Sequence, residues 1–431
     1  MSNEADTLSA VEAPRRSAGI RLCVMMFLQY AVWGVWLPYL ANYLGATPEQ
    51  GGLGFSGTQI GWILGLAGSI GAIAAPFIAG QVADRYLNAE RALALLLILG
   101  GVVKYVTAYQ TTYMPWLVLS VVYSVLYMPT LALTNSVAFA NLDDPEKKFP
   151  PIRSLGTIGW IVASTLFPLW WLNTDDPVEN TRRIADALRV SGVVSVLYGL
   201  YCVTLLPKTP PKRDTTHPLA FAEAFGLLRH RGFLLVTLVA LPISMIHQCY
   251  FIRTGPYLEN AVGLAVKWVG PVMSIGQWSE IVFLALLGLF IKRLGYKWVL
   301  ILGTGSYALR YGLFALQEPT WMVIGAMTLH GLNYGCFFAG AFLYVEKVAP
   351  ENIRHSAQTV FGIVILGIGP VLAGVYNGYF DRFTDPAGQQ QYHQFWWTQS
   401  AIALAATLAL LTLFNEGWRS EKTGNSAASV D

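Results

Sequence analysis

The stretch GPVMSIGQWSEIVFLALLGLF, residues 270–290, is an apolar run long enough to cross a lipid bilayer, yet it contains a glutamate. A transmembrane helix needs about 20 mostly apolar residues, because each residue adds about 1.5 Å to a path through about 30 Å of hydrocarbon. Gln277 and Glu280 lie three residues apart, so on a helix they share one face. The run therefore predicts a membrane helix that carries a polar face.

The composition of the whole chain also indicates a membrane protein. Of the 431 residues, 54% are hydrophobic and 12% are charged, whereas soluble domains carry about 25% charged residues. The 14 Trp and 21 Tyr suit the aromatic belts of the two membrane interfaces. The formal net charge of +3 is too small to indicate a nucleic-acid partner. All four cysteines fall inside apolar runs, so we expect buried thiols without a disulfide or metal role: Cys23, Cys202, Cys249 and Cys336.

Scanning the chain for apolar runs predicts twelve transmembrane helices. They fall near residues 20–44, 57–82, 91–109, 113–138, 154–172, 188–206, 232–258, 267–291, 298–316, 320–346, 356–380 and 395–414. The first run has no small-residue cleavage site, so we interpret it as a transmembrane helix and not as a removed signal peptide. The longest polar connection divides the twelve into two six-helix bundles. The predicted parts are a tail at 1–19, a bundle at 20–206, a linker at 207–231, a bundle at 232–415 and a tail at 416–431.

The basic residues set the predicted orientation in the membrane. Of the 28 Lys and Arg, 20 fall on the side of the N-terminus, five fall on the opposite side, and Lys104, Arg253 and Arg310 lie within predicted spans. By the positive-inside rule, both termini and the central linker face the cytoplasm. The sequence thus predicts a multi-pass protein of the plasma membrane, which in bacteria is the inner membrane.

Two short sequence repeats relate the halves of the chain. PYLAN at residues 38–42 ends the first predicted span, and PYLEN at 256–260 ends the seventh. IRSLGT at 152–157 opens the fifth span, and IRHSAQT at 353–359 opens the eleventh. Their matching positions indicate a six-plus-six duplication. Transporters built from two parallel halves bind substrate between them, near the bilayer midplane.

The loop after the second predicted span, GQVADRYLNAER at residues 80–91, resembles the Gly-x-x-x-Asp-Arg loop of the major facilitator superfamily. We expect Asp84 to pair near the helix ends and Arg85 to stay at the cytoplasmic interface, where both act as gating residues. An ordinary basic turn is the alternative.

Polar side chains inside the spans are the functional candidates, because they must find partners or line a water-filled path. We expect Glu280 to face a cavity, where it binds substrate hydroxyls or a proton; a salt bridge to Arg253 or Arg310 is the alternative. Gln248 suits a nucleobase edge or a sugar hydroxyl, with helix packing as its alternative. For its neighbour His247, an interhelical hydrogen bond and a proton relay both stay open. Arg253 lies nearer the outer end of its span, where we expect it to reach the interface.

Three further sets of residues share helix faces by their spacing. They are His330 and Tyr334; Arg153, Thr157 and Trp160; and Gln29 and Trp33. Such faces can hold a polar edge and stack an aromatic ring. An aromatic core with a satisfied histidine, and an interface charge at Arg153, explain the same spacings. The two prolines before Arg153 predict a break that precedes its helix.

Enzymatic and ATP-driven activities have no residues to support them. The chain contains no phosphate-cradling Gly-Lys-Ser/Thr loop, no His-Glu-x-x-His motif and no soluble domain large enough for catalysis. We therefore expect no cofactor and no metal. The expected partners are a small-molecule substrate and the lipid bilayer, with the protein acting as a monomer.

Five segments resemble the bacterial nucleoside permeases, which are the nucleoside:proton symporter family of the major facilitator superfamily. These segments are FLQYAVWGVWLPYL (27–40), YMPTLALTNSVAF (127–139), FPPIRSLGTIGW (149–160), SIGQWSEIVF (274–283) and VEKVAPENIRHSAQ (345–358). The resemblance runs from about residue 21 to about residue 415. It implies a twelve-helix fold of two six-helix bundles that imports nucleosides, driven by the proton gradient.

The resemblance also implies which residues contact the nucleoside: Arg153, Thr157, Trp160, Gln248, Gln277, Glu280, His330 and Tyr334. Two positions depart from the family pattern, since a tenth-span aspartate falls on Gly335 and a seventh-span asparagine falls on Phe251. Glu280 is then the first candidate for proton coupling, and His330 is the second. Two alternatives stay open. One is the same fold carrying a sugar or another polyhydroxylated solute, and the other is a membrane sensor that binds without transport.

Overall fold

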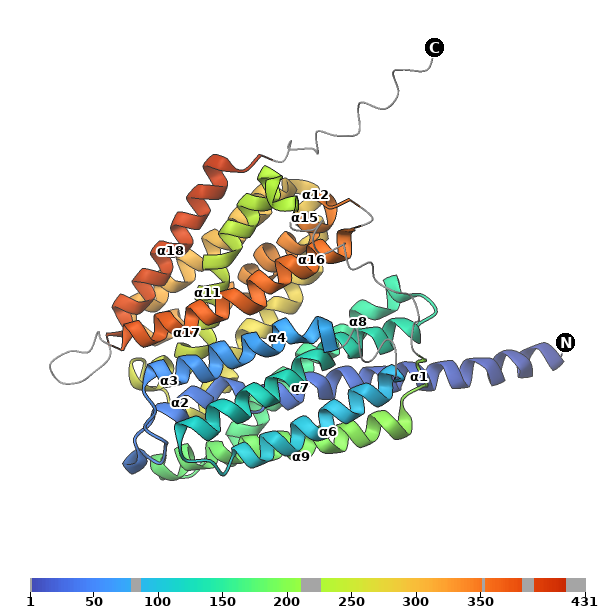
Figure 1. The fold of residues 1–431 in the computed structure, drawn as a ribbon, viewed down its shortest axis with the longest axis horizontal. Coiled ribbons are helices and arrows are strands. Elements are labelled where there is room, and N and C mark those ends of the chain that lie inside the picture. Colours follow the sequence, from blue (N-terminus) through green and yellow to red (C-terminus); the bar gives the residue numbers. More distant parts are fainter. Residues whose placement is uncertain (1, 79–86, 211–225, 351–352, 382–390, 416–431) are drawn as a thin grey trace, which may run out of the picture. The chain divides into compact units, whose positions relative to one another are not determined.

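A computed structural model describes residues 2–78, 87–210, 226–350, 353–381 and 391–415 of the chain. Every regular element within these ranges is a helix (Figure 1), which confirms the predicted all-α class. Ten of the described segments are long and apolar enough to cross a membrane. The count of twelve spans stays a prediction.

The described helices follow one another without a strand between them. From the N-terminus they are α1 (Ser2–Gly34), η1 (Leu37–Tyr39), α2 (Leu40–Gly45), η2 (Pro48–Gln50), α3 (Gly57–Gly61), η3 (Trp62–Leu66), α4 (Ala67–Phe77), α6 (Ala89–Thr107), α7 (Tyr113–Ala140), α8 (Pro145–Trp171) and α9 (Pro177–Leu205). They continue with η5 (Leu227–Arg229), α11 (Arg231–Asn260), η6 (Val266–Trp268), α12 (Val269–Leu316), α13 (Thr320–Ala326), α14 (Leu329–Leu332), η7 (Asn333–Ala339), α15 (Gly340–Val348), α16 (Arg354–Gly362), η9 (Ile363–Ile368), α17 (Gly369–Phe380) and α18 (Tyr392–Leu413).

The described residues fall into two compact units. The first unit takes its residues from Met1–Asp214, Cys249–Gln277 and Pro370–Thr384, and the second from Thr215–Gln248, Trp278–Gly369 and Asp385–Asp431. The predicted division into six-helix bundles at 207–231 stays a prediction, because residues 211–225 of that linker lie outside the described ranges.

Helix starts follow local capping chemistry, and this corrects one prediction. The Asp144 side chain accepts a hydrogen bond from the Lys147 backbone N–H, so α8 begins at Pro145, a residue suited to the first helical position. Pro150 and Pro151 therefore lie inside α8 and do not precede it as a break. Each proline removes one backbone donor early in the helix, and the Ser154 hydroxyl donates to the Pro150 carbonyl at 3.0 Å.

The first unit is held together by close helix pairs with small residues between them. The pairs α6–α9, α1–α8, α4–α7 and α6–α7 pack side by side (Figure 1). A Cβ atom on Gly101 would lie 2.7 Å from the Gly192 carbonyl oxygen, so only glycine allows α6 and α9 to approach this closely. Hydroxyls add hydrogen bonds between helices, from Ser191 to the Val32 carbonyl at 2.7 Å and from Ser195 to the Leu97 carbonyl at 2.8 Å.

In the second unit, α12 bends at Gly295, whose φ of 76° lies in the left-handed region that glycine adopts without a Cβ clash. The predicted spans 267–291 and 298–316 are the two arms of this bent helix. The second arm packs on α18 through stacked rings of Tyr311 and Trp396, with centroids 5.2 Å apart.

Candidate functional site

The second unit holds a group of buried and half-buried polar side chains that we call the His330 cluster: His247, Glu280, Tyr307, Arg310 and His330. They come from α11, from both arms of α12 and from α14. Arg310 is 0% exposed and His330 is 1% exposed. Because a buried charge is costly unless other polar groups bind it, the contacts inside this cluster decide which charges the unit can hold.

Arg310 and Glu280 approach different nitrogens of the His330 ring. The Arg310 guanidinium donates through Nη1 to His330 Nδ1 at 2.9 Å. The other ring nitrogen, His330 Nε2, lies 3.9 Å from Glu280 Oε2. The predicted alternative was a salt bridge from Glu280 to Arg253 or Arg310. In the His330 cluster the imidazole ring lies in contact with both Glu280 and Arg310.

His247 completes the cluster through an interhelical hydrogen bond, which was one of its two predicted roles. The Tyr307 hydroxyl and His247 Nδ1 are 2.6 Å apart. The His247 ring stacks on His330, with centroids 5.5 Å apart and planes 17° apart, and it also meets Tyr334 at 6.2 Å. His330 and Tyr334 therefore share a face, as their spacing predicted. Gln248 follows His247 on α11, and its contact with substrate stays a prediction.

In the first unit, Gln29 lies in a polar and aromatic wall between α1 and α7. Its side-chain Nε2 donates to Thr130 Oγ1 at 2.7 Å, and the Tyr127 hydroxyl donates to the Gln29 carbonyl at 2.5 Å. Trp33 meets the Tyr127 ring edge-on, with centroids 6.1 Å apart. Gln29 is fully buried, and its Oε1 has no hydrogen-bond partner among the described residues. An unpaired buried acceptor suits a water or a ligand hydroxyl.

The predicted face of α8 also lies in the first unit. The Arg153 guanidinium carbon lies 4.3 Å from the centroid of the Tyr30 ring, which makes a cation–π contact to α1. Trp160 is buried against Gly34, where a Cβ atom would lie 2.6 Å from the Trp160 carbonyl oxygen. Thr157 is half-buried on the same helix, and Gln277 is buried on α12. Substrate binding by these residues stays a prediction.

Arg253 is buried in the first unit with polar partners, and its predicted position near the membrane interface stays a prediction. It is 6% exposed, and it donates through Nε to Asn377 Oδ1 at 2.7 Å and through Nη2 to Asp381 Oδ1 at 2.7 Å. The second Asp381 oxygen accepts from the Thr58 backbone N–H at 3.1 Å, at the N-terminus of α3. The buried guanidinium is stabilised by hydrogen bonds to a carboxylate and an amide. These partners cannot be identified from the sequence of α11 alone.

The repeated segments PYLAN and PYLEN contact each other in the first unit. Asn42 Nδ2 donates to Glu259 Oε2 at 2.5 Å, which is a charge-assisted hydrogen bond. Gly255 lies against Pro38 and Asn42, leaving no room for a larger side chain. This contact joins the two copies of the repeated segment through non-equivalent positions, and the duplication stays a prediction.

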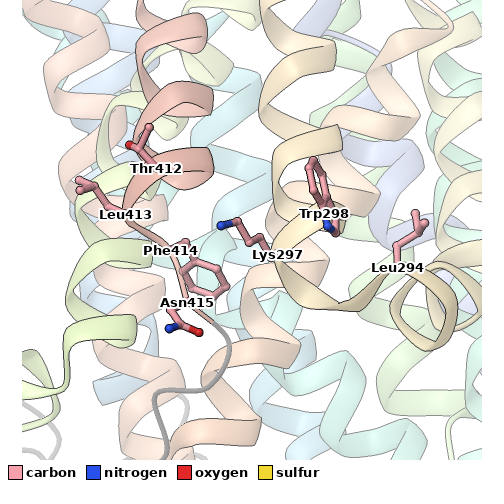
Figure 2. Close-up of a pocket in the computed structure, with 7 residues that line it drawn as sticks. All are labelled: Leu294, Lys297, Trp298, Thr412, Leu413, Phe414 and Asn415. Carbon is pink, nitrogen blue, oxygen red and sulfur yellow. The ribbon is translucent and has the colours of Figure 1, made fainter.

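Two predicted gating residues are not described by the structure, and the groove found in the second unit does not contain the predicted site. Asp84 and Arg85 are outside the described residues. A groove with a volume of about 710 Å³ lies between the bend of α12 and the end of α18 in the second unit (Figure 2). Its lining includes no predicted site residue: Leu294, Lys297, Trp298, Thr412, Leu413, Phe414 and Asn415. Across the described part of the chain, no group of three or more His, Cys, Asp or Glu side chains is placed to hold a metal ion.

Sequence reasoning singled out charges within spans but missed their partners. Tyr307, Asn377 and Asp381 carry no signal by spacing, because each pairs with a residue at least 60 positions away. Lys104 is similar. It is 3% exposed, and its Nζ lies 3.7 Å from the Trp36 ring centroid and 3.6 Å from that of Tyr123. Only a charge inside an apolar run signals such a site in the sequence.

Comparison with known proteins identifies the family. The model of the nucleoside H+ symporter family matches residues 17–419. The chain is 30% identical to the xanthosine permease of Escherichia coli (strain K12) over 96% of its own length and 100% of the permease. It is 27% identical to the nucleoside permease NupG of the same organism, over 95% and 99% of the two chains.

The fold gives the same result. The crystal structure of the nucleoside transporter NupG matches with a TM-score of 0.81 and 25% identity, covering 92% of this chain and 99% of that chain. These matches confirm the resemblance predicted from the five sequence segments. The chain therefore belongs to the nucleoside H+ symporter family, and it is a multi-pass membrane transporter of the major facilitator type.

Proposed function

We propose that this protein imports nucleosides across the bacterial inner membrane by proton symport. The observation that carries the proposal is the carboxylate of Glu280, which lies inside an apolar helix beside the buried His330 in a chain that belongs to the nucleoside H+ symporter family. An ionisable group inside an apolar helix is costly unless it is paired with another group or binds a substrate or a proton. The proton gradient is then the driving force, and no cofactor is needed.

The proposed topology has twelve membrane crossings with both termini in the cytoplasm. Support comes from Gly295, which divides the apolar segment Val266–Leu316 into two arms, each long enough to cross. The 19-residue helix α6 adds a further crossing, although Glu90, Arg91 and Lys104 lower its hydropathy. The excess of basic residues on the side of the N-terminus supports the orientation. We propose that the protein works as a monomer that alternates access by rocking its two halves.

The proposed substrate site uses polar groups for the ribose and base edge, and rings for stacking. Gln277, Glu280 and Gln248 would bind ribose hydroxyls or the base edge, because amides and carboxylates can donate or accept as these groups require. Trp160 and Tyr334 would stack on the base. The remaining candidates are Arg153 and Thr157 on the cytoplasmic side, His330 beside Glu280, and Gln29, whose Oε1 is an open acceptor.

The test is uptake of radiolabelled uridine into proteoliposomes, with and without an inward proton gradient. We expect the gradient to stimulate uptake by the wild type and not by Glu280→Gln, which keeps the shape of the side chain but cannot ionise. Exchange of uridine across the membrane without a gradient controls for binding and folding of the variant. The proposal is refuted if the wild type shows neither gradient-driven uptake nor exchange of uridine or of any other nucleoside.

A further inference from the structure

We propose that Arg310 is a positioning residue for proton coupling: it fixes the neutral His330 ring with its hydrogen on Nε2 and directs that hydrogen toward Glu280. Glu280, and not His330, then takes up the transported proton. This inference rests on the proposed function. It assigns different roles to Glu280 and His330, which the sequence indicated only as the first and second candidates for proton coupling. Its evidence is the order of contacts Arg310–His330–Glu280.

The first step concerns the hydrogen bond between Arg310 and His330. A guanidinium has only donors and keeps its proton at every physiological pH. At 2.9 Å from Arg310 Nη1, His330 Nδ1 must therefore be the acceptor and carry no hydrogen. A neutral imidazole with a bare Nδ1 carries its hydrogen on Nε2. Adding a proton to Nδ1 would aim one N–H at another beside a positive charge, so His330 is a poor proton carrier while this bond exists.

The second step concerns the direction of the remaining hydrogen. His330 Nε2 lies 3.9 Å from Glu280 Oε2, which is close enough for charge attraction but longer than a hydrogen bond. A charged Glu280 carboxylate attracts the Nε2 hydrogen of His330 across this distance. Protonation of Glu280 removes the attraction and releases the side chain from the ring. The pair thus has two arrangements, and the proton on Glu280 selects between them.

The other titratable groups around the ring support this assignment. From α11, the His247 ring stacks on His330 at 5.5 Å, and at that distance like-charge repulsion opposes positive charge on both rings at once. From α12, Tyr307 hydrogen-bonds His247, and Tyr311 places its ring centroid 5.9 Å from the Arg310 guanidinium carbon. Tyr334 from η7 meets His247. Tyrosine hydroxyls ordinarily ionise near pH 10, so among the acidic groups named here Glu280 is the one that can exchange a proton at working pH.

The first test reads the histidine ring directly. Full-length protein with ¹⁵N-labelled histidine is reconstituted in lipid nanodiscs, and the His330 signals are assigned by their loss in His330→Gln. We expect the wild type to show a neutral ring with hydrogen on Nε2 throughout pH 5 to 8. In Arg310→Gln we expect the ring to gain a proton as the pH falls, because the variant removes the positive charge beside Nδ1 that opposes protonation of the ring. Tyr307→Phe removes a cluster hydrogen bond that does not involve His330, so it is the matched control and should keep the wild-type tautomer.

The second test separates coupling from binding. Gradient-driven uridine uptake is measured against pH, together with uridine exchange in the absence of a gradient. We expect Arg310→Gln to change the pH profile of uptake while exchange persists, and Arg310→Lys to restore the profile, since an ammonium can also donate to Nδ1. If Arg310→Gln does not fold, the ring signals of the wild type and of Arg310→Lys still decide the assignment.

The outcomes distinguish this inference from the proposed function. A wild-type His330 ring that carries hydrogen on Nδ1, or that titrates between pH 5 and 8, overturns the inference even if uridine is transported. An Arg310→Gln pH profile identical to that of the wild type also overturns it. Absence of nucleoside transport in the wild type would refute the proposed function, while the ring measurement would still report whether Arg310 positions His330.

Discussion

Replacing Asp381 with asparagine tests whether the buried ion pair with Arg253 stabilises the first unit. The change keeps the size of the side chain but removes the charge that faces the guanidinium at 2.7 Å. Arg253 would stay in place, because its side chain is 7% exposed and two hydrogen bonds to Asn377 still hold it. Removing one partner of a buried pair leaves the other charge uncompensated, which costs about 3–5 kcal/mol. Since the Asp381 side chain is 22% exposed, we expect a loss near the lower end, about 3 kcal/mol.

The matched control is Asp143→Asn. Asp143 pairs with Lys148 at 2.6 Å, but the two side chains are 56% and 53% exposed. Exposed pairs contribute little, because water already solvates both charges, so we expect no measurable loss. The free energy of unfolding is measured by tryptophan fluorescence in mixed micelles with increasing denaturing detergent. Equal losses for the two variants would refute the reasoning, since both pairs join opposite charges at similar distances and differ chiefly in burial.

Three further variants extend these stability measurements. Gly61→Ala should cost about 1–3 kcal/mol of unfolding free energy, because its Cβ would overlap a backbone carbonyl of α17. Gly68 has open space around it, so Gly68→Ala should gain up to about 1 kcal/mol from helix propensity. The reversed order of stabilities would show that the helices separate easily. Asn42→Ala should lower the free energy of unfolding by about 1.5–3 kcal/mol, because it removes the hydrogen bond to Glu259, and Glu259→Gln should lower it by about half as much. No loss in either variant would mean that this bond is absent in the membrane. Lys104→Met should raise stability by about 1 kcal/mol or more, because burial of an ammonium costs several kcal/mol and the two ring contacts return about 2 kcal/mol. A lower thermal unfolding temperature of the variant would mean that the rings compensate the charge fully.

The sequence predicted the elements because membrane helices depend on local properties. About 20 apolar residues suffice to cross the hydrocarbon, and this holds whatever the helix packs against. The same reasoning marked Glu280, His330 and Arg310 as costly and hence informative. It placed a helix break before Arg153 wrongly, because the capping Asp144 starts α8 early enough to enclose both prolines. That error came from weighing the prolines without the cap.

Contacts between distant residues were decided by the tertiary structure alone. Asn42 and Glu259 are 217 positions apart, and Arg253 and Asp381 are 128 apart, so no periodicity links them. The repeat PYLAN and PYLEN indicated a duplication but not that the two copies touch. For Arg253, the sequence predicted a position near the outer end of its span, but it did not reveal the partners Asn377 and Asp381.

What the sequence by itself determined is the environment: an apolar chain whose few internal charges must be functional or paired, and a family resemblance that the comparisons confirmed. What only the tertiary structure decided is which charge meets which partner, and through which atom. In the His330 cluster, the hydrogen position follows from Arg310 reaching Nδ1 and Glu280 facing Nε2. The physical reason is that the cost of a buried charge is set by the few atoms within about 4 Å of it, and folding alone brings those atoms together.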